Sequence, residues 1–304
     1  MLDCSMSSSI SAIILTYNEE LHIERCINSL INSVDNIYIL DSFSTDRTLE
    51  IASKFSNVKI KQNRFINHAI QFNYALDAFD IDTDWVMRID ADEYVDRDLS
   101  SFLLNSLDGL PADVTGVTVN RFMTFMGKLL EHGGMSDYWM LRIWRNGLGR
   151  CEQRWMDEHI ILSNGSTIQA TGRLVDDNLN TLSWWAHKHV DYSTREAIDV
   201  LTNATSGNSD VVDSKLFGTS AERGRFLKGV YNKVPKFTRP FVYFTYRYII
   251  RMGFRDGKQG FLWHILQGFW YRMMVDAKVF EIQSAVNTNS DLKQVIKNKY
   301  DYEI

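Results

Sequence analysis

Residues 10 to 93 alternate short apolar runs with helical patterns, and this alternation restricts the possible folds more than any other feature of the chain. Ile10–Leu15, Ile37–Leu40 and Trp85–Ile89 are short and rich in β-branched or aromatic residues, as expected for buried strands. Between the first two and after the second, apolar residues recur at helical spacing over 23–31 and 48–55. Strands that alternate with helices predict a parallel, doubly wound α/β sheet.

A polar cluster follows each of these three strands: Thr16–Glu20, Asp41–Asp46 and Asp90–Glu93. Ligands bind at the carboxyl ends of the strands in such sheets, so we expect the three clusters to line one site. Asn18 is also predicted to cap the first helix, with two glutamates in its first turn.

Asp90 and Asp92 are spaced i and i+2 directly after a strand, where a turn can point both carboxylates toward one hard cation. Mg²⁺ or Mn²⁺ would fit, and it would neutralise the charge that develops on a leaving diphosphate. A solvated acidic turn is the competing interpretation, because Asp-x-Asp tripeptides also occur by chance. The two neighbouring clusters favour the metal site.

Composition places the chain among folded globular proteins, since 45% of its 304 residues are hydrophobic and 23% are charged. Cys4, Cys26 and Cys151 show no paired spacing, so neither a disulfide framework nor a cysteine zinc site is indicated. We expect a cytoplasmic protein, because Met1–Ser9 lacks the pattern of a secretory signal and no apolar run reaches the ~18 residues of a membrane span.

Three motifs, Leu15–Glu20, Leu40–Thr48 and Arg88–Glu93, resemble in order and spacing the nucleotide-sugar-binding half of family 2 glycosyltransferases with the GT-A fold. Within that family, the chain most resembles the bacterial lipopolysaccharide-core and O-antigen transferases that carry Asp-Ala-Asp-Glu and a later His-Glu motif. The resemblance is clear over about residues 8 to 160 and weaker afterwards. It implies a Rossmann-like α/β domain with a mostly parallel central sheet flanked by helices.

The domain organisation that follows is a GT-A catalytic domain over 1–205 and a basic, aromatic-rich helical extension over 206–304. The nucleotide-sugar half of the catalytic domain is expected over about 8–115 and the acceptor half over about 116–205. Asn203–Ser214, rich in Ser, Asn and Asp, is the best linker candidate.

The resemblance also implies roles for the donor-binding residues. Asp41 would receive the uracil N3–H, Tyr17 would lie against the base, Asp90 would hold the ribose or share the metal, and Asp92 would be the principal metal ligand. A carboxylate accepts from an imide N–H and an aromatic face stacks on a base, although Tyr17 as a half-buried packing residue is an alternative. For two members of the set, Gln71 and Asn73, a solvated helix face is the competing interpretation. The implied donor-binding set is Thr16, Tyr17, Asn18, Glu19, Asp41, Ser42, Gln71, Asn73, Asp90, Ala91 and Asp92.

Transfer with inversion needs a base that takes the proton from the acceptor hydroxyl. Glu158 aligns with the glutamate of the His-Glu motif, and Asp157, which stands where relatives usually have His, is the alternative base. His159 is predicted as a third metal ligand or as a hydrogen-bond partner of the base, with a plain structural role as the alternative. The resemblance places Trp155 on the acceptor side and Arg142 near the acceptor or the diphosphate; a surface cation paired with the acidic face is the alternative for Arg142.

The segment Arg223–Lys278 is electrostatically distinct, with twelve Lys and Arg against two Asp and with fourteen aromatic residues. It carries +10 while the remainder of the chain carries −15. Cations interleaved with aromatic rings suit the interface of an anionic bilayer, so we expect a peripheral location on the inner face of the plasma membrane. Nucleic acid is not expected as a partner, given the acidic remainder and the lack of a recognised module. Apolar residues at helical spacing over 261–269 suggest a third role, packing the tail on the catalytic domain.

The expected activity is inverting, metal-dependent transfer of one sugar from a nucleoside diphosphate sugar, with UDP as the expected nucleotide. The expected acceptor is a saccharide hydroxyl of a lipid-linked or lipopolysaccharide molecule in bacterial cell-surface glycan synthesis. A catalytically silent nucleotide-binding or scaffolding protein is one alternative, supported by the altered residue Asp157. A sugar nucleotidyltransferase is another, disfavoured because no Gly-rich phosphate loop follows the first strand. The sequence indicates neither the sugar nor the oligomeric state.

Overall fold

The computed structural model describes residues 8–136, 138–152, 159–206, 229–231, 233–286 and 291–302. The chain divides into two compact units. The first comprises Met1–Leu129 and Ser136–Leu179, and the second comprises Leu130–Met135 and Asn180–Ile304. The domain boundary predicted after residue 205 stays a prediction.

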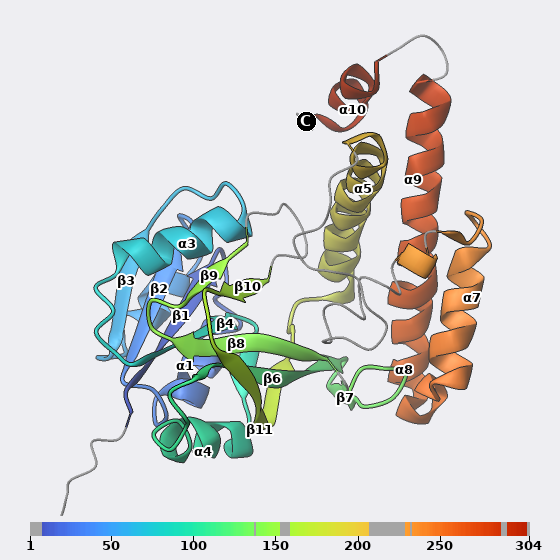
Figure 1. Ribbon diagram of the computed structural model, residues 1–304. Helices are drawn as coiled ribbons and strands as arrows, with labels where there is room; N and C mark the ends of the chain where they lie inside the picture. Colours follow the sequence, from blue (N-terminus) through green and yellow to red (C-terminus); the bar gives the residue numbers. More distant parts are fainter. Residues whose placement is uncertain are drawn as a thin grey trace, which may run out of the picture. The chain divides into compact units, whose positions relative to one another are not determined.

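A sheet of nine described strands forms the first unit, and its N-terminal half consists of four parallel strands in the order β3-β2-β1-β4 (Figure 1). The register pairs Thr16 with Asp41 and Leu15 with Asp90, so the predicted polar clusters meet at one edge of the sheet. This confirms the parallel α/β arrangement expected from the alternating sequence pattern. The four strands are β1 (Ile10–Thr16), β2 (Asn36–Asp41), β3 (Val58–Gln62) and β4 (Trp85–Asp90).

The other half of the sheet is mixed. It continues in the order β8-β6-β11-β5, where β8 runs antiparallel to both β4 and β6, and β11 runs parallel to β6. A separate antiparallel pair, β9 and β10, follows β8 in the chain. The strands of this half are β5 (Glu93–Val95), β6 (Val114–Phe125), β8 (Trp139–Arg145) and β11 (Ser166–Asp176), together with β7 (Lys128–Leu130), which pairs with β6. The strands of the separate pair are β9 (Gly149–Cys151) and β10 (Ile160–Leu162).

Helices cover both faces of the parallel half, because successive strand residues point to opposite sides. Ala12 and Ile14 pack with apolar residues of α1, α2 and α4, whereas Ile13 packs with Ala69 and Phe72 of α3 on the other face. The result is a three-layer domain with the strand ends left open at the edge. The helices are α1 (Ile23–Leu30), α2 (Thr48–Ala52), α3 (His68–Ala78) and α4 (Arg97–Asn105).

One predicted local feature is wrong. Helix α1 begins after His22, which makes no side-chain cap, and the acidic residue of its first turn is Glu24. Asn18 has a φ of 57° and its side chain accepts the N–H of Thr45 from the next loop. A tertiary hydrogen bond has therefore replaced the helix cap that the local sequence predicted.

The second unit is helical, which confirms the predicted C-terminal extension. Its core packs Ala197 and Leu201 of α5 against Val275 and Val279 of α9. Helix α5 continues through Ser206, so the first part of the predicted linker is helical, and the remainder lies outside the described residues. Among the helices that are described, none is both long and apolar enough to cross a bilayer. The elements are α5 (Leu182–Ser206), α7 (Arg239–Thr245), η1 (Tyr246–Ile250), η2 (Gly253–Asp256), α8 (Gly257–Trp263), η3 (His264–Trp270), α9 (Tyr271–Val286) and α10 (Leu292–Tyr300).

Candidate active site

The loops that follow β1 and β2 are joined to each other by hydrogen bonds. The Ser42 N–H donates to the Thr16 carbonyl at 2.9 Å, and the Asn18 N–H donates to Ser44 Oγ at 2.9 Å. In return, the Thr45 N–H donates to Asn18 Oδ1 at 2.8 Å. Asn18 reaches this position because asparagine tolerates the left-handed backbone region better than most residues. The two loops therefore form one preorganised wall of the site.

Asp41 lies at the centre of this wall and is fully buried. Its carboxylate accepts from Thr16 Oγ1 at 2.9 Å, Gln62 Nε2 at 3.0 Å, the Ser44 N–H at 2.9 Å and the Ser44 hydroxyl. A carboxylate offers about four acceptor positions, so protein donors occupy all of them. A uracil N3–H could bond to Asp41 only if one of these donors moved, and that predicted contact stays a prediction.

Two aromatic rings stand exposed at the ends of the neighbouring strands. Tyr17 is 60% exposed, which rules out the half-buried packing role considered for it. Phe43, which the sequence reasoning did not select, is 54% exposed and has a φ of 61°. A bulky residue in the left-handed region is unusual, and such conformations concentrate at functional sites. In the sequence, Phe43 could have been noticed as an aromatic residue in an otherwise polar turn.

Gln71 and Asn73 are both buried, so the alternative of a solvated helix face is wrong for them. The Gln71 amide donates to Ser42 Oγ at 3.0 Å and to the Asn63 carbonyl at 3.1 Å. Asn73 bonds to both backbone groups of Cys151, at 2.8 and 2.9 Å. Gln71 thus supports the loop after β2, while Asn73 ties α3 to β9.

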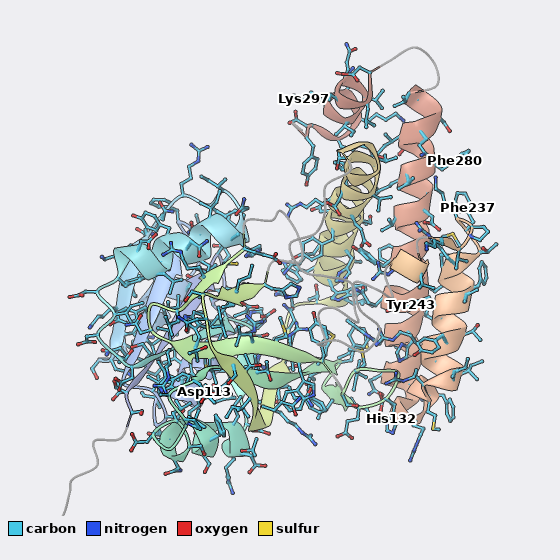
Figure 2. The ribbon with its side chains drawn as sticks, viewed as in Figure 1. Asp113, His132, Phe237, Tyr243, Phe280 and Lys297 are labelled. Carbon is cyan, nitrogen blue, oxygen red and sulfur yellow. The ribbon has the colours of Figure 1, made fainter. Side chains whose placement is uncertain are left out.

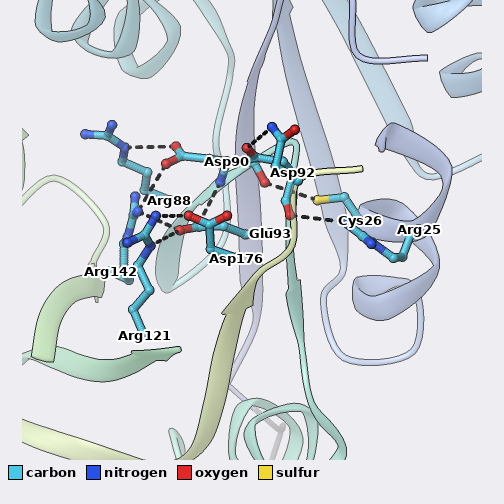
Figure 3. A network of polar contacts seen from close by, with 10 residues as sticks. Arg25, Cys26, Arg88, Asp90, Asp92, Glu93, Arg121, Arg142 and Asp176 are labelled. Carbon is cyan, nitrogen blue, oxygen red and sulfur yellow. Dashed lines mark hydrogen bonds and ion pairs between the residues drawn. The ribbon is translucent and has the colours of Figure 1, made fainter. Parts of the chain in front are cut away.

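Asp90, at the end of β4, is held by two arginines (Figure 3). Its carboxylate lies 3.2 Å from Arg142 Nη2 and 3.6 Å from Arg88 Nε, and the side chain is 40% exposed. Burial alone would raise the pKa of Asp90, but the guanidinium groups of Arg142 and Arg88 outweigh it and hold the pKa below its ordinary value. Arg142 itself is buried, so its alternative as a surface cation is wrong, and it lies behind Asp90.

Behind Asp90 lies a buried ionic network that the sequence reasoning missed. Glu93 accepts from Arg121 Nε and from Arg142 Nη2, each at 3.0 Å, and also from the Asp90 N–H at 3.0 Å. Arg121 pairs in addition with Asp176 at the end of β11. Burial raises the pKa of Asp176, neighbouring carboxylates add to the shift against the pull of Arg121, and the pKa reaches about 7. The feature of the sequence that could have indicated this network is the presence of charged residues within strand-forming segments.

Asp92 is positioned by a segment far along the chain. Asn178 Nδ2 donates to Asp92 Oδ2 at 3.1 Å, and the Asp177 N–H donates to the Asp92 carbonyl at 3.0 Å. Arg25 of α1 donates to the same carbonyl at 3.1 Å and pairs with Asp177 (Figure 3 shows Arg25 beside Asp92). Within the described part of the chain, no group of three or more His, Cys, Asp or Glu is arranged to hold a metal.

The acceptor side is described only in part. Trp155, Asp157 and Glu158 lie outside the described residues. His159 is described, and its backbone pairs with Glu152: the His159 N–H donates to Glu152 Oε1 at 3.2 Å, and its carbonyl accepts the Glu152 N–H at 2.9 Å. The role of His159 as a metal ligand stays a prediction.

Comparison with known proteins identifies relatives that are named as glycosyltransferases. Residues 11–155 match the model of Glycosyl transferase family 2. An uncharacterized glycosyltransferase of Rickettsia bellii is 36% identical over 41% of this chain and 39% of its own. The lipopolysaccharide core biosynthesis glycosyltransferase LpsC of Rhizobium meliloti is 27% identical over 90% of this chain and 92% of its own.

The crystal structure of S. aureus TarS 1-349 is similar over 93% of this chain and 92% of its own, with 15% identity and a TM-score of 0.45. For the Rickettsia relatives, the matched segments span between 30% and 39% of their length. The family match covers the three strand-end motifs and the sheet that brings them together. The chain therefore carries a glycosyltransferase family 2 domain over residues 11–155, and its first unit has the GT-A type of fold.

Proposed function

We propose that this protein transfers one sugar, with inversion, from a nucleoside diphosphate sugar to a saccharide hydroxyl. The observation that carries the proposal is the register of β1, β2 and β4, which brings Tyr17, the Asp41 loop and the Asp90–Asp92 turn to one sheet edge. The exposed rings of Tyr17 and Phe43 offer flat apolar surface to a base. UDP is the proposed nucleotide.

A divalent cation fits the end of β4. The donors available there are carboxylate oxygens, which Mg²⁺ and Mn²⁺ prefer, and Asn178 fixes the orientation of Asp92. Asp90 keeps a charged, partly exposed carboxylate beside it. Asp92, with Asp90, would hold the ion, and the ion would supply charge neutralisation for the leaving diphosphate.

Other residues of the chain would position Asp90 and take the proton of the attacking hydroxyl. Arg142 and Glu93 would act as positioning residues, because they hold Asp90 by its carboxylate and its N–H. Glu158 is the proposed base that takes the proton of the attacking hydroxyl, with Asp157 as the alternative. Arg142 is buried and bonds to Asp90, and its predicted contact with the acceptor stays a prediction.

Calorimetric titration of UDP, with and without Mn²⁺, tests the donor site. We expect metal-dependent binding by the wild type and its loss in Asp92→Ala. Asp82→Ala is the matched control, because Asp82 is an exposed aspartate that precedes the other end of β4. Hydrolysis of UDP-sugars by the wild type then separates an active transferase from a silent nucleotide-binding protein. Absence of binding to UDP, GDP and dTDP would refute the proposal.

The proposed acceptor is a lipid-linked saccharide, presented at the inner face of the plasma membrane. The likeness to LpsC, named for lipopolysaccharide core biosynthesis, supports this, as does the basic segment Arg223–Lys278. The structure reduces the number of cations that can face lipid. Arg239 is buried against Asp276, and Lys278 donates to the carbonyl of Val190 at 2.6 Å. These two cations stabilise the helical unit itself.

A further inference from the structure

The outer face of α7 and η1 is apolar. Phe241, Val242, Tyr246, Ile249 and Ile250 are each between 40% and 65% exposed. Their spacing of one, three or four residues places them along one side of the helix. A surface helix of a folded protein normally turns such a stripe toward the core and its polar side toward water.

The arginines of the same helix point the other way. Arg239 is 4% exposed, and its Nε donates to the buried carboxylate of Asp276 at 2.8 Å. Arg247 is half-buried, and its guanidinium donates to the Gly133 carbonyl at 2.5 Å and to the Tyr243 hydroxyl at 2.7 Å. The charged groups are thus used inside the unit, and the apolar stripe is left outside.

The exposed apolar surface extends beyond this helix. Met252, Phe254 and Phe261 continue it over η2 and α8, each more than 40% exposed. Phe237 and Phe280, whose ring centroids lie 5.9 Å apart, extend it to α9 (Figure 2). Contiguous exposed apolar surfaces of this kind mark interaction sites.

The charges that flank the stripe are of one sign. Lys233, Lys236, Arg251, Arg255 and Lys258 are exposed. The sequence has one acidic residue between positions 229 and 262, Asp256, which is buried and bound to His132 at 2.6 Å. A second copy of the chain would bring these cations against each other, whereas anionic lipid headgroups would attract them, at about 1 kcal/mol per cation.

We infer that this outward apolar stripe, Phe241 to Ile250 with its continuation to Phe261, inserts into the surface layer of an anionic bilayer. Together, α7 and η1 span Arg239–Ile250 and extend about 18 Å along the helix axis. This is too short to cross a ~30 Å hydrocarbon core, so the helix lies along the surface. The inference specifies the element behind the proposed membrane location. Membrane binding then depends on the insertion of apolar side chains, aided by the exposed cations, and not on attraction by all the basic residues of the segment.

Sedimentation with vesicles tests the inference. The full chain is mixed with phosphatidylcholine vesicles, with or without phosphatidylglycerol, and the bound fraction is measured. We expect the double variant Ile249→Ser, Ile250→Ser to bind the anionic vesicles about tenfold more weakly than the wild type, because it loses two inserted apolar side chains. Leu104→Ser, which changes an exposed leucine on α4 of the first unit, should bind like the wild type.

UDP binding, measured without vesicles, is the independent readout and should be unchanged in the double variant. Unaltered vesicle binding by that variant would overturn the insertion while leaving the transferase proposal intact. Loss of a concentration-dependent dimer in the double variant would also overturn it, because the stripe would then be an interface between copies. Vesicle binding as expected from a chain that binds no nucleotide would support the insertion and refute the proposed donor site.

Discussion

Replacing Glu93 by Gln should destabilise the first unit strongly. Glu93 is 1% exposed and lies 3.0 Å from both Arg121 Nε and Arg142 Nη2. Glutamine has the same shape but no charge, so the buried guanidinium group of Arg142 and the partly buried one of Arg121 each lose an ionic partner. Removal of one partner from a buried ion pair costs about 3–5 kcal/mol. With a urea dependence of about 2 kcal/mol per molar, the unfolding midpoint should fall by roughly 1.5–2.5 M.

The assay is urea unfolding followed by circular dichroism and tryptophan fluorescence. Glu50→Gln is the matched control, since Glu50 pairs with Arg47 at 3.1 Å on an exposed helix surface. Solvent screens such a pair, and its loss should leave the midpoint unchanged. If both variants gave the same midpoint as the wild type, the network around Glu93 would be no more important than a surface pair, and the reasoning would be refuted.

Three further results are expected. Asp176 has a pKa raised to about 7, so in the folded state it keeps a proton that the unfolded chain loses above about pH 4. The free energy of unfolding should therefore fall as the pH rises from about 4 to about 7. Asp176→Asn should flatten this part of the curve of unfolding midpoint against pH. Gly133→Ala should lower the thermal midpoint more than Gly147→Ala, because both have positive φ but only at Gly133 would a Cβ meet His264 Nε2, at 2.2 Å. Asn178→Ala should raise the Mn²⁺ concentration needed for half-maximal UDP binding several-fold, as measured by calorimetry, with no change at saturating metal.

The parallel half of the fold was predictable because its strands are buried on both faces. Such strands are continuous apolar runs, and the polar residue that ends each run marks the sheet edge. The register that places Asp41 beside Thr16 follows from this pattern. The predicted helix cap at Asn18 is wrong because the Asn18 side chain accepts the Thr45 N–H from the next loop. A local sequence pattern does not reveal such a tertiary partner.

The ionic network could not be predicted for a related reason. Arg121 and Asp176 lie on β6 and β11, and their parallel pairing joins segments that are 55 residues apart. A buried charge has no signature in its own segment, because its partner is chosen by the packing of the sheet. Asn178, which lies 86 residues from Asp92, escaped notice for the same reason.

The distribution of hydrogen bonds at the sheet edge favours a division of roles among its carboxylates. Asp41 and Glu93 are buried and bond to protein donors, so they fix the loop after β2 and the end of β4. Because folding has already ordered these groups, a ligand that binds there loses less affinity to the ordering of side chains. Tyr17 and the carboxylate of Asp90 remain exposed, as their proposed contacts with the donor require. Because Asp41 already bonds to Thr16, Ser44 and Gln62, this arrangement favours positioning of the loop after β2, rather than direct contact with the base, as the role proposed for Asp41.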